Sequence, residues 1–175
     1  EKEVLYSDWY SIKTAPTSDV DFSFMLYGDS RSGDEKHSQV VEQMKIAQKK
    51  DPARFVVHTG DMVTNGYEEW RWQSKFFDPI DDMLAVLPIF PAPGNHELNQ
   101  HQYTDYFKPP EKSTYYSFQY GNAEFFSIDS NIDFKTGSPQ HQWLADALSS
   151  SDARWKIAFF HHPAYSCAVM RKPGD

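Results

Sequence analysis

The segment FVVHTGD, residues 55–61, combines an apolar run of strand length with a turn that ends in an acidic side chain. Short apolar runs bounded by turn residues are typical of strands buried inside a sheet, so Phe55–His58 is predicted to be such a strand. Gly60 and Asp61 end it. A carboxylate in this position lies at the tip of a buried strand, where a ligand can reach it.

The same arrangement of an apolar run and a polar turn occurs three more times along the chain. The runs and their turns are Phe22–Tyr27 with Gly28-Asp29, Leu87–Phe90 with Gly94-Asn95-His96-Glu97, and Trp155–Phe160 with His161. Apolar residues at helical spacing fall between the first three runs, at residues 39–47 and 68–87, with a break expected at Asp78-Pro79. This alternation predicts an α/β domain with parallel strand pairing.

The second half of the chain adds a hairpin and one more helix. Tyr115–Tyr120 and Ala123–Ile128 are predicted strands joined by a Gly-Asn turn, and Pro139–Leu148 has the pattern of an amphipathic helix. Because each polar turn follows a strand, we expect one mixed sheet in which four segments end at the same edge. These segments are residues 24–27, 55–58, 88–90 and 156–160.

Length and composition indicate a folded globular chain. With 175 residues, 39% of them hydrophobic and 16% aromatic, the chain is sufficient for one domain with a core. Its formal net charge of -8 argues against nucleic acid as the main partner, because proteins that bind nucleic acids carry basic patches. No apolar stretch has the length of a membrane span, and Cys167 is the single cysteine, so an internal disulfide is excluded.

Four polar side chains are candidates for a metal site at the expected sheet edge: Asp29, Asp61, Asn95 and His161. Carboxylate, amide and imidazole ligands together suit Mn, Fe or Zn. An aspartate can also bridge two ions about 3.5–4 Å apart, an arrangement used to hydrolyse phosphoesters. Taken singly, a Gly-Asp pair after a strand is more often a capped turn, and His161 would equally fit a core histidine. Their joint occurrence after predicted strands favours the metal site.

In their order along the chain, these motifs resemble those of the calcineurin-like metallophosphoesterases, whose pattern runs Asp-x-His, Gly-Asp, Gly-Asn-His-Asp/Glu and a strand-end His. The resemblance covers about residues 22–166, and Gly94-Asn95-His96-Glu97 is its most specific part. Residues 155–165 look most similar to the purple acid phosphatase branch, in which the metal-binding histidine lies two positions before Pro-x-Tyr. This spacing favours His161 over His162. The resemblance implies an αββα sandwich with mixed sheets.

The resemblance also implies a reaction and a role for each candidate residue. The expected reaction is hydrolysis of a small phosphoester, first of all a phosphomonoester, by two divalent or trivalent ions of Fe, Mn or Zn and a metal-activated water that attacks phosphorus. Asp29 would bind the first ion and Asp61 would bridge both ions. Asn95 and His161 would bind the second ion, and His96 would face the phosphate as an acid or hydrogen-bond donor.

Two other activities share these motifs. One is a phosphodiesterase or nucleotidase of the same family, and the other is a phosphate-binding or adhesive module that kept the fold without catalysis. An extracellular or periplasmic location is expected from the resemblance to the purple acid phosphatase branch. Glu97 is expected to support the ligands, and His58 and His37 are expected to be a packing residue and a surface residue, respectively.

Two positions depart from the family pattern. Arg31 stands where most members have the second ligand of Asp-x-His, and a guanidinium has no lone pair for a metal ion. We expect Arg31 to grip a phosphate oxygen, with a surface arginine as the alternative. Thr64 stands where purple acid phosphatases have a metal-binding tyrosine, so the first metal site is expected to lack ligands.

The two ends of the chain carry separate expectations. Residues 9–13 alternate like a strand before a Pro- and Ser-containing linker, and residues 1–18 are expected to be the remnant of a preceding β-sandwich of fibronectin type. Residues 19–175 are then the N-terminal part of a metallophosphoesterase domain. The family's Gly-His-x-His motif, which would supply the remaining imidazoles, is expected beyond Asp175.

Overall fold

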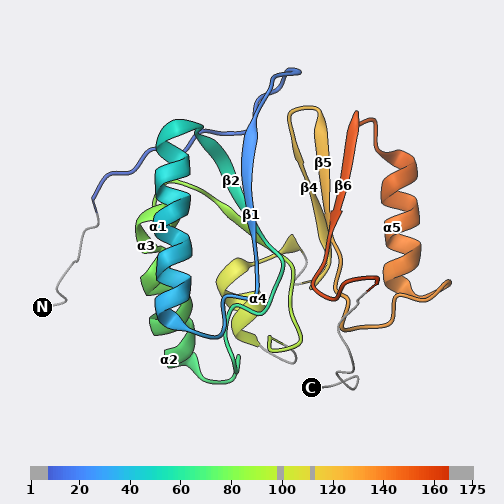
Figure 1. The fold of residues 1–175 in the computed structure, drawn as a ribbon. Helices are drawn as coiled ribbons and strands as arrows, with labels where there is room; N and C mark the ends of the chain where they lie inside the picture. The colour runs from blue at the N-terminus through green and yellow to red at the C-terminus, as the bar shows by residue number, and fades with distance from the viewer. Residues whose placement is uncertain (1–7, 98–100, 111–112, 166–175) are drawn as a thin grey trace, which may run out of the picture.

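A computed structural model describes residues 8–97, 101–110 and 113–165 of the protein. Two three-stranded sheets pack face to face, and helices cover the outer face of each sheet (Figure 1). The predicted αββα sandwich is confirmed by this arrangement. In the part of the chain that the structure describes, no helix has both the length and the apolar character needed to span a membrane.

The first sheet contains the first three predicted strands. Its order is β1 (Ser23–Tyr27), β2 (Ala53–His58) and β3 (Ile89–Pro91), and both pairings are parallel. The helices that connect these strands are α1 (Asp34–Lys50), α2 (Glu69–Arg71), the π-helical segment η1 (Trp72–Phe77) and α3 (Asp78–Leu84). The predicted break at Asp78-Pro79 coincides with the change from π-helix to α-helix, where proline is tolerated in the first turn.

The second sheet contains the hairpin strands and the last strand. Strands β4 (Tyr116–Tyr120) and β5 (Ala123–Ser127) are antiparallel, and β6 (Trp155–Phe159) pairs with β5 in parallel. The expectation of one mixed sheet that includes residues 156–160 is therefore wrong. Helix α5 (Pro139–Ser150) makes the crossover between β5 and β6, which keeps β6 beside β5. Helix α4 (His101–Phe107), which was not predicted, precedes β4.

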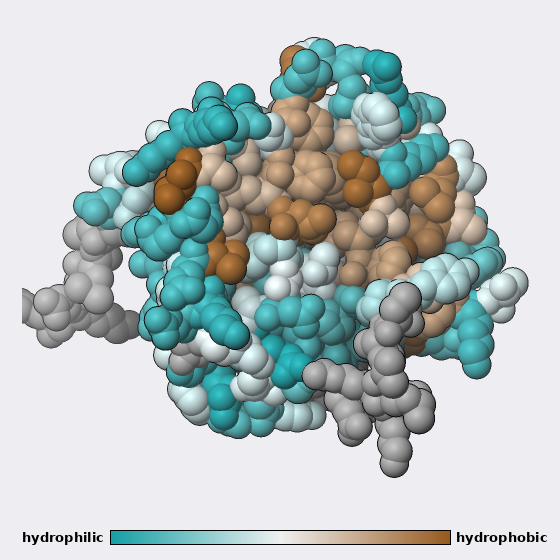
Figure 2. Space-filling model, viewed as in Figure 1, coloured by the Kyte–Doolittle hydropathy of each residue, from teal (hydrophilic) through white to brown (hydrophobic). Residues whose placement is uncertain are grey.

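Strand β2 alternates between two cores and so holds the layers together. Phe55 and Val57 face the second sheet, where they join a largely aromatic cluster that includes Phe125. Val56 and His58 lie on the opposite face of the pleat, and Val56 packs with residues of α1 and α3. Apolar side chains also gather over the edge strands β1 and β6 on the face seen in Figure 2.

The segment before β1 has no regular secondary structure between residues 8 and 22. The strand expected at residues 9–13 is therefore not formed, and Trp9 is fully exposed. A preceding β-sandwich that ends near residue 18 stays a prediction.

Candidate metal centre

The loops after β1 and β2 are tied together by their backbones. The N–H of Asp29 donates to the carbonyl oxygen of Gly60 at 3.0 Å, and the N–H of Arg31 donates to that of Asp61 at 3.0 Å. Asp29 and Asp61 both have a left-handed backbone, with φ of 54° and 57°, which aspartate tolerates better than most residues. The two carboxylates are thus fixed side by side beyond the first sheet.

The loop after β3 meets the loop after β2 at two glycines. A Cβ on Gly60 would lie 2.5 Å from the backbone nitrogen of Gly94, and a Cβ on Gly94 would lie 2.2 Å from Asp61 Oδ1. Neither distance is possible for a real side chain, so glycine is required at both positions. The close approach brings the Gly94-Asn95 turn against Asp61.

Glu97 holds the same two loops together from inside the protein. Its Oε2 accepts the N–H groups of Asp61 and Gly94, each at 2.8 Å, and its Oε1 accepts those of Met62 and Val63 at 2.8 and 3.2 Å. Burial raises the pKa of Glu97, while these backbone donors favour its charged form. The carboxylate therefore shapes the turn that presents Asp61.

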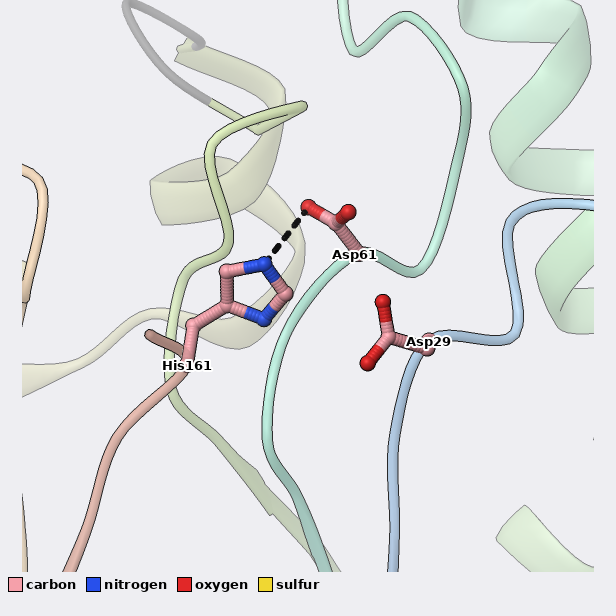
Figure 3. A group of neighbouring side chains, drawn as sticks. All are labelled: Asp29, Asp61 and His161. Atoms are coloured by element: carbon pink, nitrogen blue, oxygen red, sulfur yellow. Dashed lines mark ion pairs between the residues drawn. The ribbon is translucent and has the colours of Figure 1, made fainter. Parts of the chain in front are cut away.

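The four predicted ligand side chains meet at the carboxyl ends of β1, β2, β3 and β6. Asp29, Asp61 and His161 project into one space, with one ligand atom of each within 4.8 Å of the others (Figure 3). His161 Nε2 lies 3.4 Å from Asp61 Oδ1 and 3.2 Å from Asn95 Oδ1. Asp61 is buried and Asp29 is exposed. Although β6 belongs to the second sheet, His161 at its end still lies beside Asp29 and Asp61.

The hydrogen bonds of His161 leave its Nε2 facing the other ligands. Its Nδ1 lies 2.9 Å from the carbonyl oxygen of Thr59, so Nδ1 carries the proton and donates it. In the neutral ring, Nε2 then directs a lone pair toward the oxygens of Asp61 and Asn95. A metal ion, or a proton on Nε2, relieves the repulsion among these three atoms. Imidazole, carboxylate and amide oxygen fit Mn, Fe or Zn.

Comparison with known proteins identifies the family. The sequence profile of the calcineurin-like phosphoesterases matches residues 5–174. The chain belongs to this family. Acid phosphatase type 7 of Danio rerio is 28% identical over 173 residues, which cover 87% of this chain and 38% of the relative. Probable purple acid phosphatase 20 of Arabidopsis thaliana is 27% identical over 175 residues, which cover 90% of this chain and 39% of the relative.

A solved structure shows the same fold. The purple acid phosphatase PPD1 from yellow lupin (Lupinus luteus) seeds superposes with a TM-score of 0.65 at 18% identity, covering 82% of this chain and 30% of that chain. This calcineurin-like phosphoesterase chain therefore spans 38% and 39% of the length of the two curated relatives.

His96 lies beside the candidate ligands and is held by two hydrogen bonds. Its backbone N–H donates to Asp61 Oδ1 at 3.2 Å, and its ring Nδ1 donates to the carbonyl oxygen of Thr64 at 2.7 Å. The ring is therefore anchored through Nδ1, which leaves Nε2 as the atom available to a substrate. This geometry supports the role toward phosphate that the sequence predicts for His96, which stays a prediction.

Arg31 is bound to Asp61 through its side chain as well as its backbone. Its Nε lies 2.6 Å from Asp61 Oδ2, and its side chain is 24% exposed. The side chain therefore contacts Asp61 rather than pointing into solvent, as the alternative of a surface arginine would require. The predicted grip on a phosphate oxygen stays a prediction.

His58 contributes to the site in a way that sequence reasoning missed. The fully buried ring accepts the N–H of Gly60 at Nδ1, 3.1 Å away, and so donates from Nε2 to Ser30 Oγ at 3.1 Å. His58 thus joins the loops that carry Asp29 and Asp61. Burial lowers the pKa of His58 to about 3, so the ring is neutral. His37, expected at the surface, is buried instead and donates from Nδ1 to the carbonyl oxygen of Lys75 at 3.0 Å.

His162 hydrogen-bonds to Ser130, and its ring lies edge-on to that of His161 with centroids 4.9 Å apart. Its backbone N–H donates to Ser130 Oγ, and its ring Nδ1 lies 2.8 Å from the same oxygen. It also borders a groove of about 690 Å³ lined by apolar side chains that include Phe134, Leu144 and Phe160. The geometry therefore separates the two neighbouring histidines, with His161 facing Asp61 and His162 facing the groove.

Proposed function

We propose that this chain contributes the metal centre of a hydrolase that acts on phosphomonoesters. The observation that carries the proposal is the convergence of Asp29, Asp61 and His161 from three separate loops, with ligand atoms within 4.8 Å of one another. Similarity to proteins named as acid and purple acid phosphatases supports a phosphomonoester as the substrate. The overall acidic charge leaves positive charge to be supplied locally at the site.

Two metal ions are the arrangement that the family resemblance implies. Asn95 Oδ1, His161 Nε2 and Asp61 Oδ1 would hold one ion, and Asp29 with Asp61 Oδ2 would face the other. When bound, Fe, Mn or Zn would neutralise the phosphate and lower the pKa of a water molecule to give a nucleophile. For the ion at Asn95 and His161, three donor atoms are in place. On the other side of Asp61, Oδ2 is already bound to the Arg31 guanidinium.

The chain's own side chains would position the substrate and move a proton. Glu97 and Gly94 fix the carboxylate of Asp61, so the ligand does not need to reorganise when substrate binds. His96, whose Nδ1 donates to the carbonyl oxygen of Thr64, would act on the leaving oxygen as a hydrogen-bond donor or acid in its imidazolium form, in which Nε2 also carries a proton. Loss of the Glu97 carboxylate would misplace Asp61, and loss of the contact with Thr64 would misplace His96, although both side chains would still be present.

The proposal is tested by hydrolysis of p-nitrophenyl phosphate by the full-length protein with added Mn²⁺, Fe²⁺ or Zn²⁺. We expect Asp61→Asn to abolish turnover, because it removes a ligand charge at the centre of the site. Asp82→Asn is a matched control, since Asp82 is an exposed acid paired with Lys45 on the outer surface. Full activity in Asp61→Asn, or none in the wild type with any of the three metals, would contradict the proposal.

A diester substrate separates the phosphodiesterase alternative in the same assay. A higher kcat/KM for bis(p-nitrophenyl) phosphate than for the monoester would favour a phosphodiesterase or nucleotidase. The non-catalytic module is favoured by the Arg31–Asp61 ion pair, which neutralises the proposed bridging carboxylate. Binding of inorganic phosphate without hydrolysis of either ester would identify that module.

We also propose a location outside the cytoplasm, which rests on the resemblance to the purple acid phosphatase branch. The lack of any internal cysteine pair is compatible with either compartment. Fractionation of cells that express the full-length protein tests the proposal, and recovery in the cytoplasm alone would contradict it.

A further inference from the structure

The two oxygens of Asp61 have different surroundings. Oδ2 accepts a hydrogen bond from Arg31 Nε at 2.6 Å. Oδ1 lies 3.4 Å from His161 Nε2 and accepts the backbone N–H of His96 at 3.2 Å. One side of the carboxylate therefore faces a fixed cation, and the other side faces an imidazole nitrogen.

The contact between Arg31 and Asp61 is built into the fold. The same arginine donates its backbone N–H to the carbonyl oxygen of Asp61 at 3.0 Å, so backbone and side chain bind one residue. The side chain of Asp61 is 2% exposed, and a buried carboxylate needs a cation or several donors close to it. A guanidinium stays charged at all relevant pH values, so this partner is permanent.

The side occupied by Arg31 is unsuited to a metal ion. A guanidinium offers donors and no lone pair, so Arg31 cannot become a ligand. An ion bound to Oδ2 would also lie against a like charge in a partly buried place, where repulsion is poorly screened. On the other side, Asp61 Oδ1, Asn95 Oδ1 and His161 Nε2 lie within reach of one another and can all bind a cation.

We propose that the Arg31 guanidinium takes the place of one of the two metal ions, so that the centre holds a single divalent ion on the side of Asn95 and His161. Arg31 then supplies the positive charge on the Oδ2 side, and Asp29 is left to face that charge or the substrate. The inference rests on the proposed function only in requiring a metal ion at this centre. It changes the number of ions and the identity of the second cation.

Metal stoichiometry in the full-length protein tests the inference. After loading with excess Mn²⁺ and desalting, elemental analysis should give one ion per wild-type chain, and the Mn²⁺ electron paramagnetic resonance spectrum should show resolved hyperfine lines of an isolated ion. Arg31→His replaces the cation with a ligand and should bind a second ion, with exchange-broadened lines. Arg31→Met removes the charge without adding a ligand, so its second ion should bind at least about tenfold more weakly than in Arg31→His.

Two further variants serve as controls. One keeps a positive charge at position 31, and the other removes an arginine away from the metal centre. Arg31→Lys keeps a cation and should stay at one ion. Arg71→Met removes an arginine of similar exposure, 28% against 24%, that pairs with Glu68 away from the centre, and it should also stay at one ion. The comparison of Arg31→Met with Arg71→Met thus isolates the charge beside Asp61.

The outcomes distinguish this inference from the proposed function. Two tightly bound ions in an active wild-type protein would overturn the inference and leave the hydrolase proposal standing. One ion in the wild type and still one in Arg31→His and Arg31→Met would show that Arg31 does not limit the number of ions, which also overturns it. A wild-type protein that binds no ion and hydrolyses no ester would overturn both.

Discussion

The carboxylate of Glu97 accepts the backbone N–H of Asp61 at 2.8 Å, although the two acidic residues lie 36 positions apart in the sequence. Both are buried, so the protein places a second negative charge behind the proposed ligand. The proximity of Asp61 contributes to the raised pKa of Glu97 after burial itself. The arrangement persists because four backbone N–H groups point at Glu97, and a cation in front of Asp61 would stabilise it further.

Glu97→Gln is expected to destabilise the protein and weaken metal binding together. One carboxylate oxygen would be replaced by an amide nitrogen, which cannot accept the backbone N–H groups that this oxygen now accepts. Each buried donor left unpaired costs about 1–3 kcal/mol. Urea unfolding should show this loss, and titration calorimetry with Mn²⁺ should show affinity about 10–100-fold lower. Glu124 is a half-buried acid that accepts a hydrogen bond from Ser117 Oγ, and Glu124→Gln serves as the control. Its metal affinity should equal that of the wild type. An unchanged unfolding midpoint in Glu97→Gln would contradict the role of Glu97.

The buried His58 predicts a pH dependence of stability. Its pKa is about 3 in the folded protein against about 6.5 in an unfolded chain, so the unfolded state takes up a proton that the folded state refuses. The contribution of neutral His58 is complete above about pH 6.5 and is lost as the pH falls towards about 3. The free energy of unfolding should fall by about 1.4 kcal/mol per pH unit across this window, and His58→Asn should remove that slope in urea titrations.

A control on the same strand separates this effect from lost packing. Val56→Ala opens a cavity beside α1 and α3 and lowers stability, but it removes no titrating group. Its pH slope should therefore match that of the wild type at a lower overall stability. Parallel slopes in His58→Asn and the wild type would show that another group accounts for the acid sensitivity.

Local patterns in the sequence were sufficient to predict the ligand strands and their turns. Apolar runs that end in Gly-Asp or Gly-Asn-His-Glu identified the strands leading to Asp61 and Asn95, and the structure brings these loops together. The sheet in which β6 lies was not predictable, because a strand after a crossover helix can join either neighbouring sheet. The layer order therefore came from the family resemblance rather than from periodicity.

Contacts between side chains that lie far apart in the sequence could not be predicted from it. Arg31 and Asp61 are 30 positions apart, and no local pattern reports that the guanidinium reaches the carboxylate. His58 looked like a packing residue because it belongs to an apolar strand, and only the loop geometry reveals its bonds to Gly60 and Ser30. His37 was expected at the surface because polar residues surround it in sequence, whereas the helix α1 turns it toward Phe76.

His96→Ala is expected to lower turnover while leaving metal content nearly unchanged. The ring is held by Thr64 and reaches the metal centre only through its backbone N–H, which alanine keeps. Loss of a general acid typically costs about 10²–10⁴-fold in rate. With phenyl phosphate, kcat should fall by that range. The loss with p-nitrophenyl phosphate should be smaller, because p-nitrophenolate leaves readily without protonation. Metal lost in proportion to activity would instead make His96 a ligand.

Gly94→Ala is expected to disrupt the metal centre through a single methyl group. The new Cβ would lie 2.2 Å from Asp61 Oδ1 and 2.3 Å from the backbone nitrogen of Asp61, so either the ligand or the loop after β3 must move. Mn²⁺ affinity of the full-length protein should fall by more than about tenfold in calorimetry, since the displaced atom is the oxygen that faces His161.

Gly137→Ala provides the contrast for Gly94→Ala, because it combines open space with a strained backbone. Among the described residues, no atom outside Gly137 and its two chain neighbours lies within 4 Å of the position of its Cβ, but its φ of 91° is unfavourable for alanine. It should lower stability by about 1–2 kcal/mol in urea unfolding while Mn²⁺ affinity stays at the wild-type value. Equal metal affinity in Gly94→Ala and the wild type would show that the loop after β3 can yield without moving Asp61, and that the glycine of Gly94-Asn95-His96-Glu97 has another purpose.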